Sequence, residues 1–120
     1  MRRRSEEGLK LKLKEKNKMT ITKNQEADKL TFSLEGRLDT VTSPQLEGEL
    51  RTSVNGVTEL VIDLQNLDYI SSAGLRVLLA AQKVMNRQGG MKVTNIKPEI
   101  MEIFEVTGFV DILNIETLKR

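Results

Sequence analysis

The sequence predicts an α/β fold, a mixed β-sheet with helices packed against it in the order β-β-α-β-α-β-α-β. The chain after Met19 first alternates polar and apolar residues, as strands with one buried face do. Beyond Ser43, segments with apolar residues at helical spacing alternate with short apolar runs, of which residues 60–64 are the clearest. Strands that alternate with helices usually pair in parallel, so the whole sheet is expected to be mixed.

The first two strands are expected to form a hairpin. Residues 20–23 and residues 30–34 both alternate, and polar residues that include Asn24 and Asp28 lie between them. The sequence Gly-Arg-Leu-Asp at residues 36–39 then breaks the alternation. We therefore expect the second strand to end before this motif.

A first helix is predicted over residues 44–53, because Ser43 is a suitable N-cap and a proline follows it at the first helical position. Leu46 and Leu50 are four residues apart, which places both on the face that packs on the core. A turn then leads into the strand predicted over residues 59–64.

The central helix is predicted over residues 72–87, with Ser72 as its N-cap and a pair of glycines after its end. Its broad apolar surface is expected to consist of Leu75, Leu78, Leu79, Val84 and Met85. These residues recur at helical spacing, which predicts that the helix packs on the sheet.

The C-terminal part is expected to contribute one more strand, helix and strand. Residues 91–94 read as a strand, and a helix follows from Pro98 to a stop at Thr107-Gly108. The apolar face of this helix is expected to contain Ile100, Ile103 and Phe104. Residues 110–115 are predicted to form a last short strand or an extended segment.

The composition excludes most catalytic chemistry. The 120 residues include no histidine and no cysteine, which removes His-dependent nucleophiles, HExxH zinc sites, thiolate metal sites and disulfides. Neither an SxxK nor a GxSxG motif surrounds Ser72. We therefore expect a protein that is not an enzyme, with no catalytic residue, no cofactor and no bound metal.

Charge is distributed unevenly along the chain. Residues 1–18 carry a net charge of +5, whereas residues 19–120 carry −3. We expect the basic segment to be a disordered tail whose deletion leaves folding and partner binding intact, and residues 19–120 to form a single domain. A mildly acidic domain argues against direct binding of nucleic acid. Because no signal peptide or apolar stretch near the roughly 20 residues of a membrane span is found, we expect a cytoplasmic protein with no membrane span.

Two adjacent hydroxyls, Ser71 and Ser72, lie where a strand is expected to end and the central helix to begin. The free backbone N–H groups of a first helical turn attract anions, so a phosphate on Ser72 would be stabilised there. The simpler interpretation is that Ser72 only caps the helix.

Five motifs together resemble the STAS domain of bacterial anti-sigma factor antagonists, and the resemblance extends from about residue 19 to residue 115. They are GRLD at 36–39, LVIDL at 60–64, ISSAGL at 70–75, GG at 89–90 and FEVTGF at 104–109. The resemblance implies a STAS-like fold. It also implies that the non-phosphorylated protein binds an anti-sigma factor that is a serine kinase and so frees a sigma factor. Phosphorylation of one serine would end the binding, and the participation of a phosphatase is left open.

The resemblance places the phosphoacceptor at Ser72 and an acidic family position, close to it in the fold, at Asp39. An aspartate before a helix is equally expected to serve only as a turn or cap residue. The partner-binding residues that the resemblance implies are Asp39, Thr40, Ser71, Gly74, Leu75 and Arg76.

The chain departs from the family pattern next to the acceptor. Ser71 and Ala73 stand where the family commonly has an aspartate and a small hydroxyl residue, which makes Ser71 a second candidate acceptor. Arg76 stands where a small residue is common, and it would either add a contact to an acidic partner or block one. The alternatives are a STAS module that binds a nucleotide or lipid-like ligand, a subunit of a transport or signalling assembly, and an enzyme.

Overall fold

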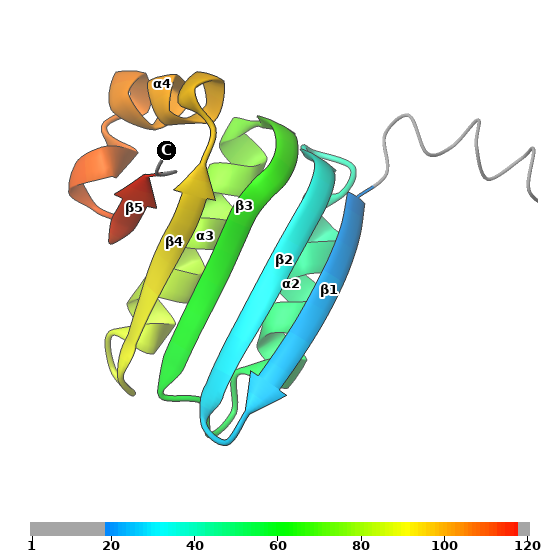
Figure 1. The fold of residues 1–120 in the computed structure, drawn as a ribbon, viewed down its shortest axis with the longest axis vertical. Helices are drawn as coiled ribbons and strands as arrows, with labels where there is room; N and C mark the ends of the chain where they lie inside the picture. Colours follow the sequence, from blue (N-terminus) through cyan, green and yellow to red (C-terminus); the bar gives the residue numbers. More distant parts are fainter. Residues whose placement is uncertain (1–18, 118–120) are drawn as a thin grey trace, which may run out of the picture.

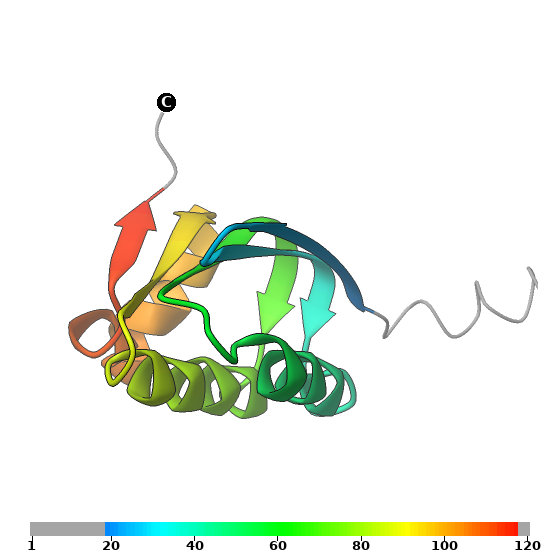
Figure 2. The same ribbon diagram turned by 90° about the horizontal axis from the view of Figure 1, so that it is seen from below.

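The computed structural model describes residues 19–117, which form a sheet of five strands with helices packed against one face (Figures 1 and 2). The elements are β1 Met19–Glu26, β2 Lys29–Leu38, α2 Ser43–Ser53, β3 Glu59–Ile70, α3 Ser72–Met85, β4 Gly90–Ile96, α4 Pro98–Thr107, the 3₁₀ helix η2 Phe109–Asp111 and β5 Ile115–Thr117. This order confirms the predicted mixed α/β fold. The predicted basic tail, residues 1–18, lies outside the described residues.

Spatial order in the sheet follows chain order, β1-β2-β3-β4-β5. β1 pairs antiparallel with β2, whereas β2, β3, β4 and β5 pair in parallel with their neighbours. The helical crossovers through α2 and α3 move in the same direction across the sheet, so crossovers of one hand place these two helices on the same face. Figure 2 shows α2 and α3 side by side beneath the strands. The carboxyl ends of β2 and β3 are therefore neighbours above the starts of these helices.

The core lies between the sheet and the two helices. Alternation in β2 buries Leu30, Phe32 and Leu34 toward the helices, as the polar-apolar pattern predicts. From the helices, the buried side chains include Leu46 and Leu50 of α2 and Leu75, Leu78 and Met85 of α3. In the described part of the chain, no helix is long and apolar enough to cross a membrane.

The first four strands are all longer than predicted, and β2 and β3 extend the farthest beyond their expected ends. β2 continues through Gly36 to Leu38, and β3 continues beyond residue 64 to Ile70. Register shifts in the β2–β3 pairing, one of them between Gly36 and Arg37, let the strands resume pairing after the alternation is interrupted. Gly36 has φ of 105°, which a glycine adopts without strain. The expectation that residues 36–39 end the strand is therefore wrong, and Leu38 is a buried strand residue.

The last predicted strand is also corrected. Residues 110–115 do not form one extended segment, because Gly108 closes α4 with φ of 83° and the chain turns at once into η2. Only Ile115 belongs to β5, where it pairs with Val93. The central helix ends at Met85 rather than residue 87, and Val84 is 45% exposed instead of packing on the sheet.

Candidate functional site

The loops that follow β2 and β3 meet at one edge of the sheet. Leu38 and Ile70, the last residues of the two strands, are paired in register. The Ser71 N–H donates a hydrogen bond of 2.9 Å to the carbonyl of Leu38. The serine pair at the start of α3 therefore lies beside the loop that begins at Asp39.

The N-cap of α3 is Ser71, not Ser72. Ser71 has an extended backbone, since it directly follows the long strand β3, and its Oγ accepts from the Gly74 N–H at 3.4 Å. Ser72 is the first helical residue and is exposed. Its hydroxyl makes no hydrogen bond within residues 19–117. The prediction that Ser72 caps the helix is therefore wrong by one residue. Because Ser71 is the cap, the Ser72 hydroxyl has no capping hydrogen bond.

Gly74 and Leu75, which the resemblance places among the partner-binding residues, both pack against the core in this structure. A Cβ on Gly74 would lie 2.6 Å from Leu38 Cγ and 3.0 Å from Ile70 Cγ1. Leu75 is only 2% exposed. Glycine thus allows the first turn of α3 to pack directly on the ends of both strands, and this contact sets the position of Ser72.

Asp39 organises the loop between β2 and α2. Its Oδ1 accepts from the N–H groups of Val41 and Thr42, both at 3.0 Å. The Thr42 hydroxyl accepts from the Asp39 N–H at 2.9 Å and donates to the carbonyl of Arg37 at 2.7 Å. Asp39 therefore has the turn-forming role that an aspartate before a helix was expected to have.

Hydrogen bonding keeps Asp39 ionised. Burial of the carboxyl, which is 14% exposed, would by itself raise its pKa. The hydrogen bonds from the Thr42 N–H and hydroxyl, from the Val41 N–H and from Arg37 outweigh burial, so the pKa lies below its ordinary value. The loop beside Ser72 thus carries a negative charge at neutral pH.

A cation–π contact borders the same edge of the sheet. The Arg37 guanidinium lies 4.3 Å from the centre of the Tyr69 ring, and its Nε is 3.5 Å from Asp39 Oδ2. Sequence reasoning missed this cluster. The two residues come together because the register of β2 and β3 pairs Arg37 with Tyr69, and no local sequence pattern indicates this register.

Next to Ser72, a hollow of about 310 Å³ lies between the start of α2 and the first turns of α3. Its lining consists of Thr40, Ser43, Pro44, Glu47, Ala73, Arg76, Val77 and Ala80. Ser43 is buried there, and its Oγ has no hydrogen-bond partner in the described chain. The predicted residues Thr40 and Arg76 therefore line one concave surface.

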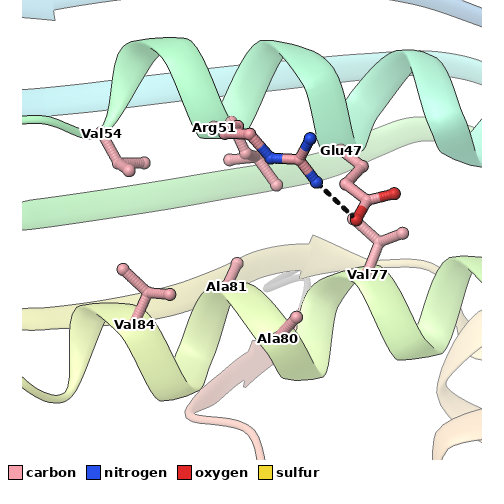
Figure 3. Close-up of a pocket in the computed structure, with 8 residues that line it drawn as sticks. Glu47, Arg51, Val54, Val77, Ala80, Ala81 and Val84 are labelled. Carbon is pink, nitrogen blue, oxygen red and sulfur yellow. Dashed lines mark hydrogen bonds and ion pairs between the residues drawn. The ribbon is translucent and has the colours of Figure 1, made fainter.

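An apolar groove of about 190 Å³ continues from this hollow between α2 and α3 (Figure 3). The hollow and the groove share Glu47, Val77 and Ala80. In Figure 3 the Glu47–Arg51 ion pair, 3.0 Å long, lies over one wall, while valine and alanine side chains of α3 form the other. Sequence reasoning assigned Val84 to the core and so missed this surface.

Comparison with known proteins identifies the family. A family model described as the STAS domain matches residues 18–119, and the chain belongs to that family. A Bordetella bronchiseptica protein described as "putative anti-sigma factor antagonist BtrV" is 41% identical over 96 residues, covering 78% of this chain and 83% of that protein.

Solved structures agree with this assignment. An anti-sigma factor antagonist from Mycobacterium paratuberculosis has a TM-score of 0.76 and 25% sequence identity, over 83% of this chain and 86% of that one. The Bacillus protein SpoIIAA in its phosphorylated form shares the fold, with a TM-score of 0.64 and 17% identity over 80% of this chain and 90% of that one. The resemblance found in the motifs is confirmed at the level of family and fold.

Proposed function

We propose that this protein is an anti-sigma factor antagonist controlled by phosphorylation of Ser72. Its non-phosphorylated form binds an anti-sigma factor with serine kinase activity, which frees a sigma factor. Phosphorylation of Ser72 by that kinase ends the binding.

The observation that carries the proposal is the contrast between the two adjacent serines. The Ser71 hydroxyl is engaged as the N-cap of α3, whereas the Ser72 hydroxyl is exposed and has no partner within residues 19–117. A kinase needs an accessible hydroxyl, and Ser72 is exposed. The packing of Gly74 and Leu75 against the core, in the same helical turn, also holds Ser72 in place. These contacts favour Ser72 over Ser71 as the acceptor.

The descriptions of two similar proteins support the same function. BtrV is described as a "putative anti-sigma factor antagonist", and SpoIIAA, which shares the fold, has been solved in a phosphorylated form. A phosphorylated member of the fold supports the idea that these proteins remain folded after modification.

Phosphorylation acts on the interface rather than on the fold. A phosphoserine adds about −1.5 to −2 charges and three acceptor oxygens. At the N-terminus of a helix this charge is stabilised by the helix dipole and by free N–H groups, so α3 keeps its structure. A partner surface that fits a neutral hydroxyl beside the ionised Asp39 would instead have to desolvate a dianion. Binding is lost while the antagonist stays folded.

The proposed partner surface differs from the one expected from the sequence, because it loses buried residues of α3 and gains the groove between α2 and α3. Gly74 and Leu75 are removed from it because they are buried, and Asp39 acts mainly by holding its loop. Of the expected partner-binding residues, Thr40, Ser71 and Arg76 remain in it, next to the proposed acceptor Ser72. The apolar groove between α2 and α3 extends it, because the groove is continuous with the hollow at Arg76.

The acceptor is tested by incubating the protein with ATP and each anti-sigma-type serine kinase from the same genome, followed by intact mass measurement and site mapping. We expect a single phosphate on Ser72, none in Ser72→Ala, and normal phosphorylation of Ser71→Ala. Phosphate on Ser71 alone would contradict the assignment. No phosphate on folded protein with any of these kinases would contradict the switch.

Binding to the anti-sigma factor is then measured by calorimetry with Ser72→Ala and Ser72→Asp. We expect Ser72→Ala to bind like the unmodified protein even after treatment with kinase and ATP. Ser72→Asp should bind at least about tenfold more weakly, which corresponds to about 1.4 kcal/mol. Equal affinities for both variants would exclude a charge-controlled interface.

A further inference from the structure

Arg76 lies one helical turn beyond Ser72 on the exposed side of α3. Residues four apart on a helix are neighbours on its surface, about 5–6 Å apart at their Cβ atoms. Both Ser72 and Arg76 are exposed. A group attached to the Ser72 hydroxyl therefore lies within reach of the Arg76 guanidinium without any change in the helix.

Arg76 has no ion pair within residues 19–117. The acidic residue that shares the hollow with it, Glu47, is paired with Arg51 at 3.0 Å. The nearby Asp39 is occupied by its own loop and by Arg37. The first turn of α3 contains no acidic residue. Among residues 19–117, Arg76 is thus a cation without an ion-pair partner, one helical turn from the proposed acceptor.

The start of α3 also holds unused backbone donors. Ser71 Oγ accepts from the Gly74 N–H, the Ser71 carbonyl accepts from the Leu75 N–H, and the Ser71 N–H is bonded to Leu38. The N–H groups of Ser72 and Ala73 have no partner within residues 19–117. An anion at this point would receive hydrogen bonds from these donors on one side and from a guanidinium on the other.

We propose that the phosphoryl group on Ser72 captures Arg76 in an ion pair along α3, so that Arg76 is withdrawn from the surface offered to the partner. The inference rests on the proposed function, since it assumes that Ser72 is phosphorylated. It assigns Arg76 a second role in the switch. In the unmodified protein the guanidinium is available to an acidic group of the anti-sigma factor. After modification the surface gains a dianion and loses an available cation in the same event.

The covalent attachment is what makes this pair form. A free phosphate would have to be immobilised before it could bind to an exposed arginine, whereas the phosphoryl group on Ser72 is already held next to Arg76 by the helix. The ion pair is intramolecular, so it forms at any protein concentration. It also forms whether or not an anti-sigma factor is present.

The experiment places phosphoserine at position 72 by genetic encoding, so that no kinase is needed, and follows the second phosphate ionisation by ³¹P NMR titration. The parent protein is compared with Arg76→Gln and with Lys83→Gln. Lys83 is the matched control, because it is another exposed cation of α3 but lies in its last turn. Arg76→Lys keeps the charge and tests whether the guanidinium itself is needed.

We expect the second pKa of the phosphate, ordinarily near 6, to be at least about 0.2 unit lower in the parent protein than in Arg76→Gln, as an exposed i,i+4 pair predicts. Lys83→Gln should match the parent, and Arg76→Lys should keep part of the shift. In 1 M salt the difference should shrink, because exposed charges are screened. A difference below about 0.2 unit, or an equal effect of Lys83→Gln, would overturn the proposal.

The outcome of this titration does not depend on whether a natural kinase phosphorylates Ser72. A failure of natural kinases to phosphorylate Ser72 leaves the titration of the encoded phosphoserine unchanged. Conversely, the absence of a shift leaves Ser72 free to act as a phosphoacceptor without help from Arg76. Because Arg76 is exposed and makes no ion pair within residues 19–117, Arg76→Gln is expected to fold normally, and circular dichroism of each variant verifies this.

Discussion

The inner and outer faces of the first turns of α3 differ sharply in burial, although their residues alternate within one short segment of the chain. On the inner side, Gly74 packs so closely that no side chain fits, and Leu75 and Leu78 are buried. On the outer side, Ser72 and Arg76 are exposed and have no ion pair or side-chain hydrogen bond within residues 19–117. The comparison shows how a modification site can be held rigidly while its modification leaves the fold unchanged. The inner side fixes the position, and the outer side carries the chemistry.

The largest effect is expected from the inner side. Leu75→Ala should lower the free energy of unfolding by about 2–5 kcal/mol, because it removes a buried side chain and leaves a cavity. Urea unfolding followed by circular dichroism measures this. The matched variant Arg76→Ala, one residue along the same helix, should change stability by no more than about 0.5 kcal/mol. Similar losses in the two variants would contradict the division between the two sides.

An intermediate effect is expected at Asp39, where the acidic loop meets the start of α3. Its folded pKa lies below the ordinary value of 3.8, so ionised Asp39 stabilises the folded state above that pH. This contribution is lost as the pH falls through the folded pKa, because the unfolded chain binds the proton first. Asp39→Asn should cost about 1 kcal/mol at pH 7, and its difference from the parent should diminish below the ordinary pKa.

Unfolding at a series of pH values provides the measurement for Asp39. Asp68→Asn is the control, because Asp68 pairs with Lys97 but is 67% exposed and is expected to contribute little. If Asp39→Asn lost the same stability at every pH, ionisation of Asp39 would not be the source of its effect.

The smallest effect is expected at Ser72, and the sharpest comparison is with the adjacent Ser71. Ser71→Ala removes the N-cap and should cost about 1 kcal/mol. Ser72→Ala and Ser72→Asp should each change stability by no more than about 0.5 kcal/mol, because the Ser72 side chain is exposed and uncommitted. Thermal unfolding of the three variants measures the contrast. A Ser72 variant less stable than Ser71→Ala would reverse the assigned roles.

The order of elements was predictable because it depends on local patterns. The alternation in β2 and the spacing of Leu46 and Leu50 in α2 are features of neighbouring residues. The full length of β3 was not predictable, because its polar middle residues hide a strand that resumes after a register shift. β3 ends at Ile70, and Ser71, one residue before the predicted Ser72, is the N-cap of α3.

The candidate site was predictable only as a set of residue types. The serines and Asp39 could be selected from motifs, and the strand order brings their loops together. The burial of Leu75 could be predicted from its helical spacing, whereas that of Gly74 could not, since it depends on close contacts with Leu38 and Ile70. The contact between Arg37 and Tyr69 likewise depends on strand register.

Because the strands lie in the sheet in the order in which they occur in the chain, the sheet can grow from one edge as the protein is translated. Each strand from β2 onward pairs with the strand made immediately before it, so no strand has to be inserted between two that are already paired. The two strands that carry the site, β2 and β3, can therefore pair before β4 has been made. The surroundings of Asp39 and Ser72 can begin to assemble from the first part of the domain while the chain is still growing.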